Sequence, residues 1–420
     1  MKLSYKDYIN TYLSATKNQI AFDDCHRNIQ KKWLPYIPRI SKWLKFWLIS
    51  PFFINALFFI IFLLFSLGGF IFYSLLCFFN FVYIYATHII KEKNNLNLKK
   101  KKNKELYYIA LSSLGYESLE HAFLNNHQIT IITVPWVKIN KKEKYSYLSI
   151  LSLINIFDII KVFFNSLVAG FFFLLSSNER KWFLQFYTAP KWFLVAAAID
   201  KINGDIITSE HFDRWAVLLD TISLYKNINL ILIQHGSLKA FHTSEYSNLE
   251  IPYKLRNISC IHVYDEEELN IFKNKIIKNE LSGRLEVNFI RLKINLTNID
   301  NVKFKILYIG HPLCENFQMH LYNELCRKIP ETLFFYKEHP QARASNKARY
   351  AGWEFIEKKD RFPNVNIVIS YPSTLAFQYQ EEGVDVVTHD LTVEKITNIE
   401  CNIICELIYE KWKSYEEKKL

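Results

Sequence analysis

No two cysteines of this 420-residue sequence form a C-x-x-C pair, and the seven cysteines are too odd in number to pair completely within one chain. Cys401 and Cys405 stand one helical turn apart, but no nearby pair of cysteines or histidines completes a zinc site. The pattern indicates buried, reduced thiols in a cytosolic protein, and we expect no metal site. Residues 1–44 also lack the short apolar core and small-residue cleavage site of a signal peptide.

No DNA- or RNA-binding motif accompanies the formal net charge of +11. A positive net charge is typical of proteins that bind nucleic acid, an anionic membrane surface or an anionic substrate. Much of the excess lies beside one apolar block, at Lys99–Lys102 and Lys104. This placement favours membrane lipid as a partner, and we expect no nucleic-acid partner.

Charge is missing altogether from residues 46–90, apart from any charge on His88. One membrane-spanning helix needs about 20 apolar residues, so this run is long enough for two. Gly68 and Gly69 lie near its middle and suit a turn, while lysines flank both ends. The sequence therefore predicts a helical hairpin at about 46–90, with both flanks on the cytoplasmic side. A buried hairpin in a protein core is the less favoured alternative, because a core helix usually has one polar face.

Strand and helix patterns alternate after the lysine run, which predicts an α/β fold of two Rossmann-like domains with parallel sheets. In the first half we expect strands at 105–114, 128–136, 205–209, 229–233, 260–264 and 285–290. A long apolar stretch at 145–177 is expected to form a helix that packs on the sheet or docks on a bilayer. The predicted organisation is a membrane-anchoring segment at 1–104, an N-terminal acceptor domain at 105–290 and a C-terminal nucleotide-donor domain at 291–420.

Polar residues follow the strands expected at 332–336 and 365–369, which we expect to be neighbours in the C-terminal sheet. Ligands of parallel sheets bind beyond the carboxyl ends of the strands, and a cation, an imidazole and two hydroxyls suit a phosphate. Ser373 and Thr374 also precede a helix, where N-capping and phosphate binding use the same geometry. The candidate nucleotide-binding residues are Lys337, His339, Pro340, Ser373, Thr374, Gly310 and Glu382.

Two strands of the first half end in residues that can accept a proton. His235 follows one strand, and a histidine there can deprotonate an attacking hydroxyl, although an incidental histidine in a turn is the plainer alternative. Glu210 and Asp213 follow the neighbouring strand and supply rival carboxylate bases. The candidate catalytic residues are therefore His235, Glu210 and Asp213, and the candidate acceptor-side residues are Gln234, Gly236, Ser237, His211 and Arg214.

Over residues 105–400 this arrangement resembles the GT-B glycosyltransferases that use cytidine-nucleotide donors: sialyl- and polysialyltransferases, capsule Kdo transferases and CDP-glycerol polymerases. The resemblance lies in Lys337–Pro340, in Ser373 with Thr374, in Gln234–Gly236 and in Tyr308–Glu315. In that group a His-Pro motif and a later Ser/Thr pair hold the donor nucleotide. The sequence departs from the group at Tyr371-Pro372, where small or acidic residues are usual, and it lacks an acidic-acidic-Gly motif in the first half.

The resemblance implies a metal-independent transferase without a cofactor, on the cytoplasmic face of a bacterial inner membrane. Its donor would be a nucleotide sugar, CMP- or CDP-linked, and its acceptor a lipid-linked or surface-polysaccharide precursor. Two alternatives remain open: a CDP-glycerol-type polyol-phosphate transferase, and a non-catalytic membrane subunit of a polysaccharide assembly complex.

Overall fold

The computed structural model describes residues 5–30, 106–123, 129–175, 188–242, 246, 249–278, 280, 283–290, 294–299, 303–339, 343–357, 361–391 and 398–418, with single positions at 75, 79 and 82. The predicted hairpin at 46–90 lies outside them except at those three positions. Across the described ranges, no helix combines the length and apolar character needed to cross a membrane.

The chain divides into two compact units. Unit 1 comprises residues 1–235 and 248–290, and unit 2 comprises residues 236–247 and 291–420. The short segment 236–247 thus follows a strand of unit 1 but groups with unit 2.

Unit 1 is built on a seven-stranded parallel sheet in the order β3-β2-β1-β4-β5-β6-β7. Its strands are β1 Leu106–Ala110, β2 Ile129–Thr133, β3 Ser146–Ser149, β4 Asp205–Thr208, β5 Leu230–Ile233, β6 Ile258–Val263 and β7 Glu286–Phe289. The expectation of one helix over 145–177 was wrong at its start, because residues 146–149 form the edge strand β3. The order turns back at β1 and β4, so the sheet is doubly wound.

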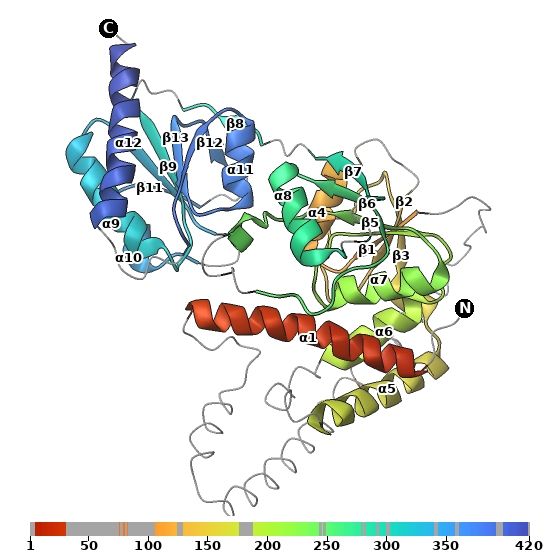
Figure 1. Cartoon of the computed structure of the whole chain (residues 1–420). Helices are drawn as coiled ribbons and strands as arrows, with labels where there is room; N and C mark the ends of the chain where they lie inside the picture. The colour runs from red at the N-terminus through yellow and green to blue at the C-terminus, as the bar shows by residue number, and fades with distance from the viewer. Residues whose placement is uncertain are drawn as a thin grey trace, which may run out of the picture. The chain divides into compact units, whose positions relative to one another are not determined.

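Four helices gather on one side of the unit 1 sheet, and α4 (Ser113–Ala122) lies on the other (Figure 1). The four are α1 Tyr5–Gln30, α5 Ile156–Leu175, α6 Ala189–Ile199 and α7 Arg214–Lys226. Tyr12 of α1 is fully buried, with its ring centroid 5.4 Å from those of Trp192 and Phe193. The indole N–H of Trp192 in turn donates to the carbonyl of Arg214 at 2.9 Å. The N-terminal helix is therefore part of the core of unit 1.

Unit 2 is built on a five-stranded parallel sheet in the order β11-β10-β9-β13-β14. Its strands are β9 Lys305–Ile309, β10 Leu333–Lys337, β11 Glu354–Ile356, β13 Ile367–Ser370 and β14 Asp385–Thr388. The strands expected to be neighbours, now β10 and β13, are separated by β9, so that expectation was wrong. β9, the first strand of this sheet along the chain, is central because β10 and β11 lie on one side of it and β13 and β14 on the other.

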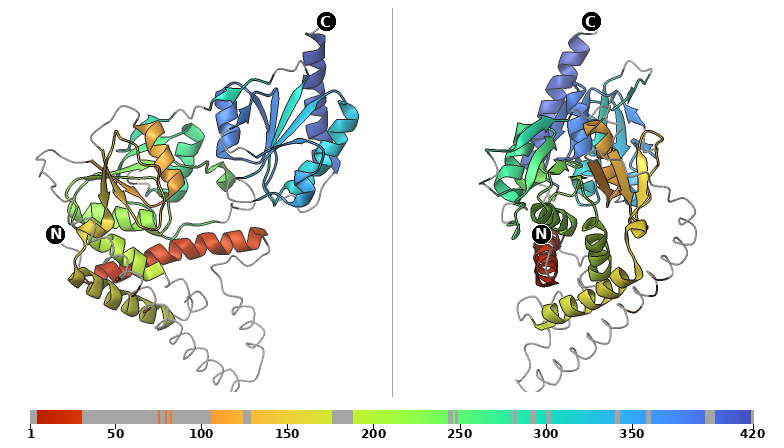
Figure 2. Two further views of the ribbon diagram at one scale, coloured as in Figure 1. Left: turned by 180° about the vertical axis from the view of Figure 1, so that it is seen from behind. Right: turned by 90° about the vertical axis from the view of Figure 1, so that its right-hand side faces the viewer.

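Alternating side chains of the unit 2 strands fill two separate cores. Ile306 and Tyr308 face the core beneath α9 (Glu315–Lys328) and α12 (Asn398–Glu417), whereas Leu307 and Ile309 face the core beneath α11 (Thr374–Glu381). Figure 1 and the left view of Figure 2 show α11 across the sheet from α9 and α12. A strand covered on both faces must be apolar at every position, as the run from Ile306 to Ile309 is.

Asn18 ties α1 to the loops of unit 1 and gives a direct test of this packing. It is 2% exposed; its amide N–H groups donate to the carbonyls of Phe212 and Tyr253 at 2.9 Å, and its oxygen accepts from Tyr253 N at 2.7 Å. We expect Asn18→Ala to lower the free energy of unfolding by about 2 kcal/mol, because it leaves buried backbone groups without partners. Thermal denaturation checks this.

Asn10→Ala is the matched control, because Asn10 is an exposed asparagine on the same helix. It should leave the melting temperature unchanged or raise it slightly, since alanine is the better helix former. Equal melting temperatures for the two variants would contradict the placement of α1.

Candidate active site

The polar edge of unit 2 lies at the carboxyl ends of its three central strands. β9 is followed by Gly310 and His311, β10 by Glu338 and His339, and β13 by the turn that leads to Ser373. The strand order reverses between β9 and β13, and in doubly wound sheets ligands bind at this point. The loop after β9 is therefore the centre of the edge.

The tautomer of His311 is set by its own loop. Its Nδ1 accepts the N–H of Leu313 at 3.2 Å, so the neutral ring carries its proton on Nε2 and is a hydrogen-bond donor there. The rings of His339 and Tyr371 lie 5.2 and 5.6 Å from that of His311 between centroids. Burial lowers the pKa of His339, which keeps that ring neutral as well.

The backbone of Gly310 fixes the position at which His311 leaves the sheet. The N–H of Gly310 donates to the carbonyl of Lys337 at 2.8 Å, which continues the β9–β10 ladder by one residue. A Cβ at this position would stand 1.9 Å from the hydroxyl oxygen of Tyr336. The strand can run this close to the tyrosine only because residue 310 has no side chain.

The N-terminus of α11 forms the other side of the switch point. Ser373 is the N-cap: its hydroxyl accepts from Ala376 N at 3.2 Å and lies 3.2 Å from that of Ser370. The first-turn N–H groups of Thr374 and Leu375 have no acceptor within the helix, which makes this end favourable for an anion. The Thr374 hydroxyl accepts the N–H of Ser237 at 2.9 Å, so segment 236–247 reaches this helix end within unit 2.

Two of the residues predicted for nucleotide binding, Lys337 and Glu382, are placed differently. Lys337 donates to the carbonyl of Arg361 at 3.0 Å, and its ammonium lies 4.8 Å from the ring centroid of Phe362. Glu382 is exposed at the C-cap of α11, about 14 Å along the helix from Ser373 at 1.5 Å per residue. Pro340 is outside the described residues. Of the polar residues that follow the three central strands, His311 has ring contacts with His339 and Tyr371, while Ser373 and Thr374 begin α11.

Glu210 occupies the corresponding switch point of unit 1, between β1 and β4. Its side chain is buried and hydrogen-bonds to Asp213 and to Ser112, which follows β1 and caps α4. Its Oε1 is buried without a hydrogen-bond partner among the described residues. Burial raises the pKa of Glu210, and the two side-chain hydrogen bonds oppose that rise.

Asp213 is the N-cap of α7, and its Oδ1 accepts from Trp215 N and Ala216 N at 2.9 Å. Burial first, and then the charge of Glu210, raises the pKa of Asp213 well above its usual value. The two carboxyls therefore retain a proton between them where isolated carboxyls have lost theirs. Arg214, predicted as an acceptor-side residue, is buried beside Asp213 and partly offsets this rise in pKa.

A pair of histidines lies beside these carboxyls, with ring centroids 4.4 Å apart. His211 accepts the backbone N–H of His235 at its Nε2, at 3.2 Å, and bonds the carbonyl of Ile233 through its other nitrogen. The Nδ1 of His235 bonds the carbonyl of Ser209, so its proton is on Nδ1 and its Nε2 is a free base. Burial lowers the pKa of both rings and keeps them neutral.

Of the remaining residues predicted for the acceptor side, Gln234 makes a structural hydrogen bond between strands of unit 1. Gln234 is fully buried and accepts Tyr264 N at 3.0 Å, which fastens the end of β5 to β6. Gly236 and Ser237 begin the segment that groups with unit 2. The sequence prediction missed His311 and Ser112 as site residues, although His311 lies within the Tyr308–Glu315 segment on which the resemblance partly depends. Within the described ranges, no cluster of three or more His, Cys, Asp or Glu residues is arranged to hold a metal.

Comparisons with known proteins give a fold-level similarity alone. No family model and no curated protein matches the sequence. A UDP-GlcNAc 2-epimerase from Neisseria meningitidis bound to UDP-GlcNAc aligns with a TM-score of 0.42 at 12% identity, over 73% of this chain and 94% of its own. HepE from Anabaena with UDP-glucose aligns at 0.42 and 11%, over 74% and 92%. TM-scores this low say nothing about a site, so the candidate site is defined only by the residues of this chain.

Gly310 allows a test of the unit 2 edge. We expect Gly310→Ala to lower the free energy of unfolding by about 2 kcal/mol, because the added methyl group overpacks the site against Tyr336. Denaturant titration checks this. Gly283→Ala is the matched control, since nothing lies within 4 Å of a Cβ built there. A Gly310→Ala protein as stable as the control would contradict the close approach.

Proposed function

We propose that this chain is a membrane-associated GT-B glycosyltransferase. It transfers a sugar from a nucleotide-sugar donor, CMP- or CDP-linked, to a lipid-linked or surface-polysaccharide acceptor. The observation that carries the proposal is that β9 and β13, the strands on either side of the switch point of unit 2, lead into His311 and into the N-terminus of α11.

On the donor side, the fold holds several hydrogen-bond donors in place, so they need not rearrange when a ligand binds. The His311 loop holds one N–H, and the first turn of α11 offers two more at Thr374 and Leu375. Fixed dipoles of this kind stabilise a phosphate whose charge increases as the sugar leaves. The hydroxyls of Ser373 and Thr374 and the ring of His339 complete this side.

On the acceptor side, His235 is the proposed base. Its Nε2 is the unprotonated nitrogen of a neutral ring, so it can take the proton of an acceptor hydroxyl. The acceptor oxygen then bonds the anomeric carbon of the donor sugar. The bond from that carbon to the phosphate oxygen breaks, and its electron pair leaves with the nucleotide. Glu210 is the rival base, but it already shares a proton with Asp213.

Association with the inner membrane, with both units on the cytoplasmic face, belongs to the same proposal. Its support is the uncharged run at 46–90 and the lysines on either side of it.

The donor site is tested by nucleotide affinity. We expect His311→Ala to weaken the binding of CMP or CDP by about 10- to 100-fold, the value of one hydrogen bond to a charged group. Isothermal titration of the full chain measures it. His320→Ala on α9 is the control histidine and should bind like wild type. Equal affinities for the two variants would refute the site, and a wild-type chain that binds no nucleotide would favour the non-catalytic subunit.

The base is tested by transfer rates with nucleotide affinity as the control. We expect His235→Gln to lower the transfer rate by about 10²- to 10⁴-fold while CMP affinity is unchanged, because the variant loses only the base. Since burial lowers the pKa of His235, the wild-type rate should hold its plateau to below pH 6.5 and fall only as the ring is protonated. If Glu210→Gln alone is inactive, Glu210 is the base; if both variants transfer normally, unit 1 does not supply it.

A further inference from the structure

The outward face of α5 is apolar, although it is not covered by any described part of the chain. Six large side chains on this helix are 43–70% exposed: Ile156, Phe157, Ile160, Phe164, Phe171 and Phe172. At 100° per residue, the last five fall within a stripe roughly 120° wide. The opposite face is buried at Ile159, Val162, Ser166 and Ala169. We call the five exposed residues from Phe157 to Phe172 the α5 ridge.

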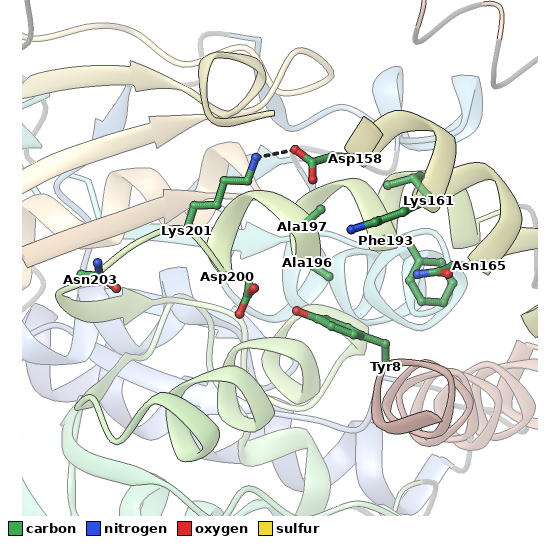
Figure 3. Close-up of a pocket in the computed structure, with 11 residues that line it drawn as sticks. Tyr8, Asp158, Lys161, Asn165, Phe193, Ala196, Ala197, Asp200, Lys201 and Asn203 are labelled. Carbon is green, nitrogen blue, oxygen red and sulfur yellow. Dashed lines mark hydrogen bonds and ion pairs between the residues drawn. The ribbon is translucent and has the colours of Figure 1, made fainter. Parts of the chain in front are cut away.

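A polar pocket of about 550 Å³ lies beside the ridge, between α5, α6 and Tyr8 of α1 (Figure 3). Asp158 and Lys201 form an ion pair at one end of it. Tyr8 bonds the carboxylate of Asp200 within it, and burial together with that charge raises the pKa of the phenol. Lys161 and Asn165 also line the pocket, and Figure 3 shows the ammonium group of Lys161 directed toward its middle. Lys161 is itself on the exposed side of α5, so it joins the pocket to the ridge.

We infer that the α5 ridge docks on an anionic phospholipid surface, with one lipid headgroup in the adjacent pocket. Phenylalanine and isoleucine gain by entering the boundary between headgroups and acyl chains. Lys161 places a cation at the level where lipid phosphates lie, and the amides and Asp200 offer partners to headgroup hydroxyls. This inference rests on the membrane association of the proposed function, and not on its chemistry.

The course of the chain supports a bilayer as the occupant. α1 supplies Tyr8 to the pocket, and α1 and α5 lie side by side in both figures of the fold. The uncharged run that begins at residue 46 follows α1 after 15 residues, counted from 31 to 45, that include interleaved tryptophans and cations. The ridge thus lies beside the N-terminal part of the helix that precedes this run in the chain.

α12 provides the matched comparison, because it also has an exposed apolar row. Ile399, Ile403 and Leu407 are 74%, 62% and 44% exposed. Exposed Glu406 and Glu410 stand on the same helix, and an anionic surface repels such a face. The ridge on α5 contains no acidic residue.

The test is lipid photo-crosslinking of the full-length chain in vesicles. Phosphatidylcholine vesicles, with and without phosphatidylglycerol, carry a photoactivatable group in an acyl chain, and mass spectrometry locates the adducts. We expect adducts on the peptide spanning 156–172, more of them with phosphatidylglycerol. Phe157→Ser/Phe164→Ser/Phe171→Ser should lower that yield about fivefold or more, whereas Ile399→Ser/Ile403→Ser/Leu407→Ser should not change it.

A single substitution separates the headgroup from the ridge. Lys161→Gln should abolish the gain from phosphatidylglycerol and keep the basal adduct yield. Flotation of the same vesicles distinguishes the docking of α5 from the membrane association of the whole chain. A chain that floats without adducts on 156–172 refutes the docking of α5 and leaves membrane association intact. A chain that does not float refutes membrane association itself. Circular dichroism of each variant verifies that its overall helix content matches that of the wild type.

Discussion

Parallel strand pairing is the constraint on which every candidate residue depends. All strands of each sheet end at the same edge, and each sheet reverses its order once, at β1/β4 in unit 1 and at β9/β13 in unit 2. Polar residues that follow those strands must therefore meet there. Glu210 with Ser112, and His311 with the N-terminus of α11, are far apart in sequence and are neighbours for this reason.

Burial determines which charges these edges have. It lowers the pKa of His211, His235 and His339, so these rings act as neutral donors or acceptors. It raises the pKa of Glu210 and Asp213, which retain a proton between them. Under the proposed function, unit 2 would therefore act through oriented N–H groups and unit 1 through one unprotonated nitrogen, rather than through exposed ions. Such groups need no reorganisation when charge develops on a leaving phosphate.

The sequence predicted the α/β class and most strands, because apolar runs that stop at polar residues are a local signal. It placed β10 and β13 side by side, because pairing depends on the direction of crossovers and not on either run. The orientation of the Lys337 side chain could not be predicted from the sequence either, because the pleat of β10 and the position of Arg361 decide where its ammonium group lies. α1 was not predicted because buried Thr11, Thr16 and Asn18 interrupt its apolar positions, and only tertiary contacts explain them.

The position of the nucleotide phosphate in a structure of the complex tests the central claim most directly. A crystal structure of the full-length protein with CDP should place a phosphate oxygen about 2.7–3.1 Å from the Nε2 of His311 and from a first-turn N–H of α11. A diphosphate bound elsewhere, or a His311 ring that turns its Nε2 away from it, would contradict the account.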